Sequence, residues 1–164
     1  MSTAAILLEW LAPQPGEDVL DLGCGLGLHS TAIARCGASV TGADPETQLL
    51  EQARLVCPSG KFLAAGLFDL DPSLRFDAIF AHAVLHWIHP PEAAVRRLFD
   101  LLRPGGRIAA SYGAKAAEAA NLVNCYLPDR AQCLELFHSA GFTAIHVEGS
   151  TRGILLRAAR PVTG

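Results

Sequence analysis

The hydrophobic positions of this chain follow two spacings that alternate along most of its length. Short apolar runs, typical of buried strands, are mostly followed by longer stretches in which apolar residues recur at helical spacing. The expected strands are residues 19–22, 38–43, 61–65, 76–81, 107–112, 142–148 and 153–159. The expected helices are residues 2–11, 28–36, 46–56, 90–102 and 130–140, with Ser2 or Thr3 capping the first and Asp129 the last.

This order of elements predicts an α/β fold of the doubly wound kind. Strands that alternate with helices form parallel sheets with right-handed crossovers, and the helices then cover both faces. The last two strands are too close for such a crossover, so they must form a hairpin, with one antiparallel member at the edge of the sheet. Because 164 residues suffice for one sizeable core, we expect a single domain, residues 1–164, with a seven-stranded, mostly parallel sheet.

The stretch Val19–Gly27, which reads VLDLGCGLG, joins the first expected strand to the second expected helix. Its glycines, Gly23, Gly25 and Gly27, make a turn that is tight and bare of side chains, so that a ligand can approach the backbone. The helix that follows presents free N–H groups and the positive end of its dipole, which suit a carboxylate or a phosphate. A plain strand-to-helix turn is the structural alternative.

Charge and hydropathy exclude several classes of partner. The chain has 13 Lys and Arg against 16 Asp and Glu, a net charge of −3, and no basic block, so nucleic acid is not an expected partner. No apolar run approaches the length of a membrane span, and the apolar patch near the N-terminus has no basic flank. We expect a cytoplasmic protein that acts on small molecules and has no membrane partner.

The 5 cysteines include no Cys-x-x-Cys pair, which argues against a disulfide framework and a thiolate zinc site. Cys24 differs from the others, because it precedes a helix N-terminus, which lowers the pKa of a thiol and would make it reactive. His82, His86 and His89 have the spacing of metal ligands on one helix face. Two prolines follow them and no carboxylate completes the set, so we expect no metal.

Several of these features together resemble the class I S-adenosylmethionine-dependent methyltransferases. They are the order of elements, the run from Asp21 to Gly27, the acidic end of the second strand at Asp44, the sequence LLRPGG at residues 101–106, and the terminal hairpin. The resemblance covers nearly the whole chain. Within the class, residues 80–88 (FAHAVLHWI) resemble the small-molecule methyltransferases, including those that methylate carboxyl groups.

The resemblance implies S-adenosyl-L-methionine as cofactor and S-adenosyl-L-homocysteine as its product. The cofactor's carboxylate would meet the N–H groups after Gly25, and its ammonium would meet carbonyl groups or a water held by Asp21. Asp44 would accept both ribose hydroxyls, although it is also placed to cap the next helix. The expected cofactor-binding residues are Asp21, Gly23, Cys24, Gly25, Gly27, His29, Asp44, Pro45, Leu67, Phe68, Ala81 and His82.

One position departs from the pattern of the family. Where an acidic residue often holds the amino group of the adenine, this chain has Gly66. Two replacements for that contact are expected from the neighbouring sequence. One is the carboxylate of Asp69, and the other is the pair of backbone N–H groups of Leu67 and Phe68.

Two other functions remain as alternatives. An NAD-dependent oxidoreductase also needs a glycine loop and an acidic residue after the second strand, but its third glycine would fall at Leu28, and no closing hairpin is expected. The second alternative is a non-catalytic domain that binds the cofactor or dimerises. It arises because the first helix and residues 113–128, which in this family usually cover the substrate, are short here.

We expect methyl transfer to an O, N or carboxyl group of a small molecule. The sulfonium is already activated, so the protein mainly aligns the acceptor and keeps water out. If the acceptor must lose a proton, His86 is the expected base and His82 the second choice, with packing of His86 within the loop as the alternative. A minimal cap and an apolar content of 51% predict a homodimer that closes each site.

Overall fold

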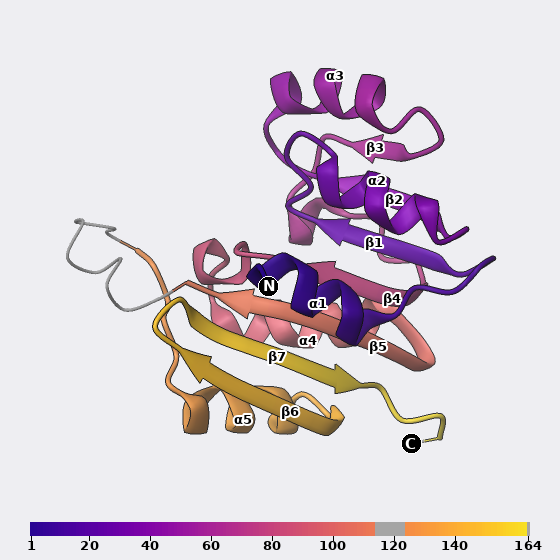
Figure 1. Ribbon diagram of the computed structural model, residues 1–164. Coiled ribbons are helices and arrows are strands. Elements are labelled where there is room, and N and C mark those ends of the chain that lie inside the picture. Colours follow the sequence, from indigo (N-terminus) through magenta and orange to yellow (C-terminus); the bar gives the residue numbers. More distant parts are fainter. Residues whose placement is uncertain (114–123, 164) are drawn as a thin grey trace.

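Seven strands form one sheet at the centre of the computed structural model, which describes residues 1–113 and 124–163 (Figure 1). The sheet has the order β3-β2-β1-β4-β5-β7-β6. The strands are β1 (Asp18–Leu22), β2 (Ser39–Ala43), β3 (Lys61–Leu63), β4 (Phe76–Ala81), β5 (Leu102–Tyr112), β6 (Thr143–Ser150) and β7 (Gly153–Ala159). The helices are α1 (Thr3–Leu11), α2 (Leu28–Arg35), α3 (Thr47–Val56), α4 (Pro91–Leu101) and α5 (Arg130–Ser139), with the 3₁₀ helices η1 (Leu67–Asp69) and η2 (Leu85–Trp87).

The strands β3, β2, β1, β4 and β5 are parallel, while β7 pairs antiparallel with both β5 and β6. This confirms the predicted seven-stranded, mostly parallel sheet with a terminal hairpin. The expected place of the antiparallel strand is corrected, because β7 lies one strand in from the edge and β6 forms the edge. Ile154, Leu155 and Leu156 are all buried, as befits a strand that is covered on both faces.

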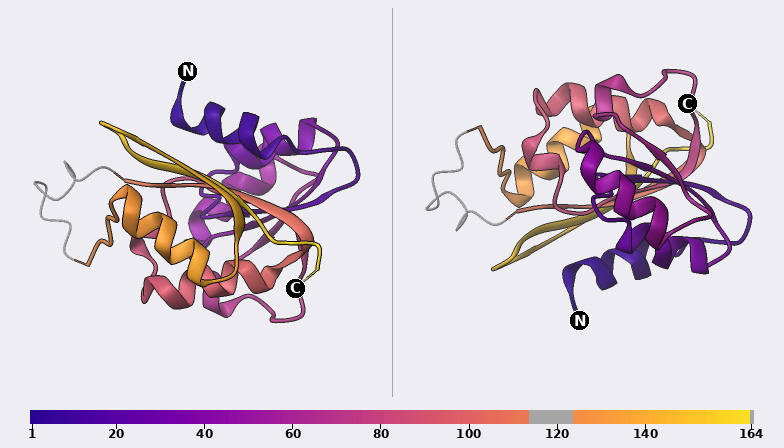
Figure 2. Two further views of the ribbon diagram at one scale, coloured as in Figure 1. Left: turned by 90° about the horizontal axis from the view of Figure 1, so that it is seen from below. Right: turned by 90° about the horizontal axis from the view of Figure 1, so that it is seen from above.

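The helices form two layers, with α1, α2 and α3 on one face of the sheet and α4 and α5 on the other (Figure 2). The larger core lies under α4 and α5 and includes Leu98 and Phe137. A second core lies under α1, where Leu7 and Leu11 pack with Phe80 of β4. Within residues 1–113 and 124–163, no helix is both long enough and apolar enough to cross a membrane.

Among the strands, β5 and β3 differ most in length from the prediction. β5 begins at Leu102, so the expected turn at residues 103–106 lies inside the strand, near an irregularity in its pairing with β4. The carbonyl of Gly106 accepts the N–H of Arg160 at 2.8 Å, which continues the pairing beyond the end of β7. β3 is shorter than expected and ends at Leu63.

The starts of α1 and α5 have the predicted caps. The Ser2 hydroxyl accepts the N–H of Ala5 at 3.2 Å. The Asp129 carboxylate accepts the N–H of Gln132 at 2.8 Å, and the Gln132 side chain accepts the N–H of Asp129 in return. This reciprocal pair is a capping box, which satisfies two donors that the helix itself leaves unpaired. The Ala-rich stretch at 114–123 lies outside the described residues.

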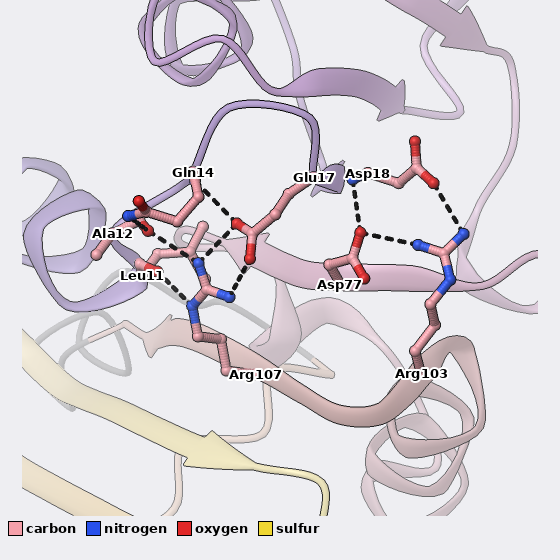
Figure 3. A network of polar contacts seen from close by, with 8 residues as sticks. All are labelled: Leu11, Ala12, Gln14, Glu17, Asp18, Asp77, Arg103 and Arg107. Atoms are coloured by element: carbon pink, nitrogen blue, oxygen red, sulfur yellow. Dashed lines mark hydrogen bonds and ion pairs between the residues drawn. The ribbon is translucent and has the colours of Figure 1, made fainter. Parts of the chain in front are cut away.

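Arg107 of β5 fixes the end of α1 against the sheet (Figure 3). Its guanidinium pairs with both carboxylate oxygens of Glu17, each at 2.8 Å. It also donates to the carbonyl groups of Leu11 and Ala12, where α1 ends and the helix supplies no donor of its own. The hydrogen bond from Arg107 lowers the pKa of Glu17. One side chain therefore joins β5 to the segment that leads into β1.

Arg103 makes a second connection of the same kind (Figure 3). It donates to the carboxylates of Asp18 and Asp77, each at 2.8 Å. Asp77 also accepts the N–H of Asp18 at 2.8 Å. These contacts lie at the amino ends of β1 and β4. The network therefore stabilises the side of the sheet that lies opposite to the carboxyl ends of the parallel strands.

We expect Arg107→Ala to lower the free energy of unfolding by about 1–3 kcal/mol, because Glu17 and two carbonyl groups lose their donor. For a domain of this size that loss corresponds to a fall in Tm of roughly 3–10 °C. Arg96→Ala, which removes an exposed pair with Asp100 on α4, is the control and should lower Tm by roughly 2 °C or less. Thermal unfolding followed by circular dichroism makes the comparison, and equal shifts in the two variants would contradict the role of Arg107.

Candidate functional site

The carboxyl ends of β1, β2, β3 and β4 meet at one edge of the sheet (Figure 1). The direction of strand order reverses between β1 and β4, since β2 and β3 lie on one side and β5 lies on the other. In doubly wound sheets, ligands bind in the crevice outside the carboxyl ends at such a switch point. The predicted site residues all belong to strand ends or to the segments that follow them at this edge.

The glycine loop, residues 23–27, has the conformation that its sequence predicts. The φ angles are +70° at Gly23, +51° at Gly25 and +80° at Gly27, a region that favours glycine. A Cβ at Gly23 would lie 2.7 Å from a methyl group of Val84, and one at Gly27 would lie 3.0 Å from Ala53. At Gly25 a Cβ would meet nothing within 4 Å. The backbone at Gly25 therefore faces open space, which a ligand that approaches the loop requires.

Asp44 follows β2 and contacts both the glycine loop and the start of the next helix. Its Oδ2 accepts the N–H of Gly25 at 3.0 Å, and its Oδ1 accepts the N–H of Glu46 at 2.9 Å. The structural alternative for Asp44, a cap of α3, is not what the structure has, because the N-cap is Glu46 and no side chain caps the helix; Asp44 instead holds the residue before the helix and the glycine loop. A carboxylate has about four acceptor positions, so each oxygen keeps a place for a further donor. Pro45, next in the chain, is exposed.

Asp21 places a buried carboxyl group beneath the loop. The residue is 1% exposed, and it accepts a hydrogen bond from the Ser30 hydroxyl at 2.6 Å. Burial raises the pKa of Asp21 to about 7, the bond from Ser30 opposes the rise, and the charge of Asp44 adds to it. Asp21 therefore gains or loses its proton in the neutral range of pH, where a cation beside it would favour the ionised form.

Leu67 and Phe68 point in different directions from η1. Leu67 is 2% exposed and packs in the larger core, whereas Phe68 is 49% exposed. Any ligand contact of Leu67 is therefore confined to its backbone. Asp69 accepts the N–H of Gly66 at 3.2 Å. Both predicted replacements for the missing acidic residue thus belong to one short turn.

His29 and His82 meet at the end of β4. Ala81, the last residue of the strand, is buried, and His82 follows it. The ring centroids of the two histidines are 5.2 Å apart in an edge-to-face arrangement, and both rings lie near Phe80. Burial lowers the pKa of both imidazoles, and His29 lowers that of His82 further. The structure thus places two neutral imidazoles side by side, a pairing that the sequence does not predict.

His86 is more buried than we expect of a general base that contacts an acceptor. It is 7% exposed, and its Nδ1 accepts the N–H of Gly113 at 3.3 Å. A neutral imidazole has one accepting nitrogen, so we assign the ring proton to Nε2. This geometry favours the structural alternative for His86, hydrogen bonding within the fold, over the expected role as a base. His82 is the more accessible imidazole.

Two further hypotheses about reactive groups do not fit the structure. Cys24 is 5% exposed, and burial raises the pKa of its thiol to about 12, so the nearby helix N-terminus does not activate it. The histidines at 82, 86 and 89 lie in a segment that turns through η2 and not on one α-helix face. Within the described parts of the chain, no group of three or more His, Cys, Asp or Glu residues is arranged to hold a metal ion.

Three residues that shape this part of the site are not among those expected from the sequence. Ser30 holds Asp21, Val84 lies against Gly23, and the Ser111 hydroxyl accepts the N–H of Ala83 at 2.9 Å. Ser30 has a weak sequence signal, because it is a small polar residue in the first turn of the helix that follows the loop. Val84 and Ser111 have none, since their roles depend on how the loop after β4 lies against neighbouring segments.

Residues 20–110 match the model of a family described as "Methyltransferase domain". Among curated proteins, the trans-aconitate 2-methyltransferase of Enterobacter sp. (strain 638) is 38% identical over 109 residues, which cover 65% of this chain and 43% of that protein. The ribosomal protein L11 methyltransferase of Burkholderia thailandensis is 35% identical over 128 residues, which cover 76% of this chain and 41% of that protein. The chain spans about two fifths of the length of these relatives.

Solved structures share the fold at lower identity. Phosphoethanolamine N-methyltransferase 2 of Haemonchus contortus, in complex with S-adenosyl-L-methionine, gives a TM-score of 0.84 at 18% identity, over 96% of this chain and 52% of that one. An S-adenosylmethionine dependent methyltransferase from Mesorhizobium loti gives 0.81 at 21% identity, over 97% of this chain and 98% of that one. The family match covers more than half of the chain. The protein therefore belongs to the methyltransferase domain family, and its fold is that of the class I S-adenosylmethionine-dependent methyltransferases.

Proposed function

We propose that this domain transfers a methyl group from S-adenosyl-L-methionine to a small-molecule acceptor. The observation that carries the proposal is the open backbone at Gly25, held by the carboxylate of Asp44 at the switch point of the sheet. Membership of the family supports the same reaction. When bound, the cofactor supplies a sulfonium-activated methyl group, so the protein has to bind, align and shield the reactants.

The residues at this edge suit the polar groups of the cofactor. Its carboxylate fits the N–H groups that follow Gly25 at the start of α2. Its ammonium fits the carbonyl groups of the loop and the carboxyl group of Asp21 below them. The remaining acceptor positions of Asp44 fit the ribose hydroxyls. The exposed ring of Phe68 offers an apolar surface for the adenine, with Pro45 beside Asp44 as a second one.

The acceptor would approach on the side of β4, where His29 and His82 lie. A neutral imidazole can take up a proton from a hydroxyl or an amine, so His82 is the base that we propose for such an acceptor. An acceptor that is already an anion needs no base. The other tasks are alignment of the acceptor with the methyl group and exclusion of water.

The names of the relatives point to acceptors of different kinds, trans-aconitate in one and ribosomal protein L11 in the other. We favour a small molecule, because residues 80–88 resemble the small-molecule enzymes and because His82 is half-buried against His29 and Phe80. A screen for turnover with carboxylates, phenols, amines and thiols tests this choice. Tight cofactor binding without turnover in any class would support the non-catalytic alternative, whereas the family match removes support from the oxidoreductase.

Asp44→Ala should reduce the affinity for S-adenosylhomocysteine by roughly 30- to 1,000-fold, since the loss of two charge-assisted hydrogen bonds costs about 2–4 kcal/mol. Calorimetry measures the Kd, and circular dichroism shows whether the fold survives the loss of the contact with Gly25. Asp100→Ala, the same change of charge on the exposed face of α4, is the matched control. An Asp44→Ala variant that binds as wild type does would remove Asp44 from the proposed site.

The affinity for S-adenosylhomocysteine should fall as the pH drops below about 7. Asp21 has a pKa of about 7 in the free protein, and an ammonium group beside it favours the ionised form. Below that pH, binding must release a proton, so the Kd should rise by up to about tenfold per pH unit. Calorimetry between about pH 7 and pH 5.5 tests this, and Asp21→Asn should remove most of the dependence. A Kd that stays constant in the wild type would contradict it.

The ionisation of Asp21 also affects stability, but the folded protein without ligand favours the protonated form. Because the folded pKa of Asp21 is raised above the usual value of 3.8 for an aspartate, ionisation disfavours the fold increasingly as the pH rises from that value to about 7. Without ligand, Asp21→Asn should therefore be more stable than wild type at about pH 8, and the difference should shrink at about pH 4. Urea unfolding at the two pH values measures this difference.

Four exposed apolar side chains, Leu26, Leu28, Phe68 and Trp87, lie in segments at the carboxyl edge of the sheet. Exposed apolar side chains on neighbouring segments favour association, and we propose that a second copy of the chain covers them. Light scattering at micromolar concentration should give twice the chain mass of 17.3 kDa. Leu28→Glu should produce monomers, whereas Leu55→Glu, the same change at a still more exposed leucine on α3, should not. A wild-type mass equal to that of one chain would contradict the dimer.

A further inference from the structure

His86 connects three segments of the chain on the acceptor side of the sheet. Its ring accepts the N–H of Gly113, the residue directly after β5. Its backbone carbonyl accepts the N–H of Tyr126 at 2.8 Å, shortly before the cap of α5. Both partners are distant from His86 in the sequence, and they lie on either side of residues 114–123. One residue of η2 therefore joins the end of β5 to the segment that leads into α5.

The loop after β4 is also fixed at other points. Ala83 donates its N–H to the hydroxyl of Ser111 in β5 at 2.9 Å, and its φ of 53° is uncommon for a residue with a side chain. Leu85 is 2% exposed and packs in the larger core. After these anchors, η2 directs His86 inward, at 7% exposure, and Trp87 outward, at 48%. The two rings contact each other, with centroids 5.0 Å apart, so the buried imidazole lies against the exposed indole.

The protonation state of the His86 ring agrees with a structural role. Burial lowers the pKa of His86, so the ring stays neutral at neutral pH. A protonated ring would turn an N–H at Nδ1 toward the N–H of Gly113, and the contact would be lost. A ring whose accepting nitrogen is occupied cannot take a proton from an acceptor without breaking the same contact.

We infer that His86 is a positioning residue, which holds the loop after β4, and with it His82 and Trp87, in a fixed place relative to β5 and the segment before α5. The inference rests on the proposed function in one respect, that this side of the sheet receives the acceptor. The connection itself consists of two hydrogen bonds and one inward-facing ring. It is therefore testable without knowledge of the acceptor.

Amide hydrogen exchange at Gly113, followed by NMR, is the test. His86→Asn keeps an acceptor at the place of Nδ1, whereas His86→Gln moves it to the place of Nε2. Exchange at Gly113 should be about tenfold faster in His86→Gln than in wild type, as expected for the loss of one hydrogen bond, and close to wild type in His86→Asn. His138→Asn, a change of an exposed histidine in α5, is the control and should leave the exchange unchanged.

Two results would overturn the inference: equal exchange at Gly113 in all variants, or ring ¹⁵N shifts of wild-type His86 that place the proton on Nδ1. The ¹⁵N measurement needs no variant, so it decides the matter even if a variant does not fold. Once an acceptor is known, the kcat and KM of His86→Asn should be close to those of wild type, whereas those of His86→Gln should be impaired. Equal impairment in both variants would indicate that His86 acts as a base. Calorimetry with S-adenosylhomocysteine on the wild type separates this inference from the proposed function. Absence of binding would contradict the proposed function, and the exchange at Gly113 would still decide whether His86 holds the loop.

Discussion

The hydrogen bond from the N–H of Gly25 to the carboxylate of Asp44 joins the two strand ends on which the site depends. Next to it, the carbonyl of Ala43 accepts the N–H groups of Gly23 and Cys24, at 2.8 and 3.2 Å. The glycine loop after β1 is thus held by the end of β2 through three donors. Its left-handed backbone is set before a ligand arrives, so little further ordering opposes binding. The carboxylate that holds the loop is also the group that we propose for the ribose.

The amino ends and the carboxyl ends of the parallel strands have different roles. At the amino ends of the strands, Arg103 and Arg107 pair with carboxylates and carbonyl groups, and these contacts stabilise the fold. At the carboxyl ends, the carboxyl group of Asp21 is buried against the hydroxyl of Ser30 in α2 and disfavours the fold when it ionises. A leucine there would pack without that cost. The ligand cation that we propose above Asp21 would account for a carboxyl group in this place, since perturbed groups gather at functional sites.

The sequence predicts those features that depend on local pattern. The apolar runs of β1 and β4, the glycine turn and the caps at Ser2 and Asp129 all follow from neighbouring residues. Features that depend on contacts between residues far apart in the sequence cannot be predicted in this way. A hairpin can be predicted from the short spacing of its strands, but nothing local tells which of them pairs with β5. Likewise, nothing in the sequence around His86 shows that a 3₁₀ turn directs this ring inward to a residue at the end of β5.

The ligand roles of the site residues depend on where S-adenosylhomocysteine binds. A titration of ¹⁵N-labelled protein with this ligand, followed through the backbone amide signals, locates its site most directly. The glycine-loop site predicts saturable shifts concentrated at residues 23–29, 44–46, 66–69 and 81–83. The contradicting result is the absence of saturable shifts, or shifts confined to the groove of about 510 Å³ between α4 and α5, which is lined by Glu92, Tyr126, Gln132 and Glu135.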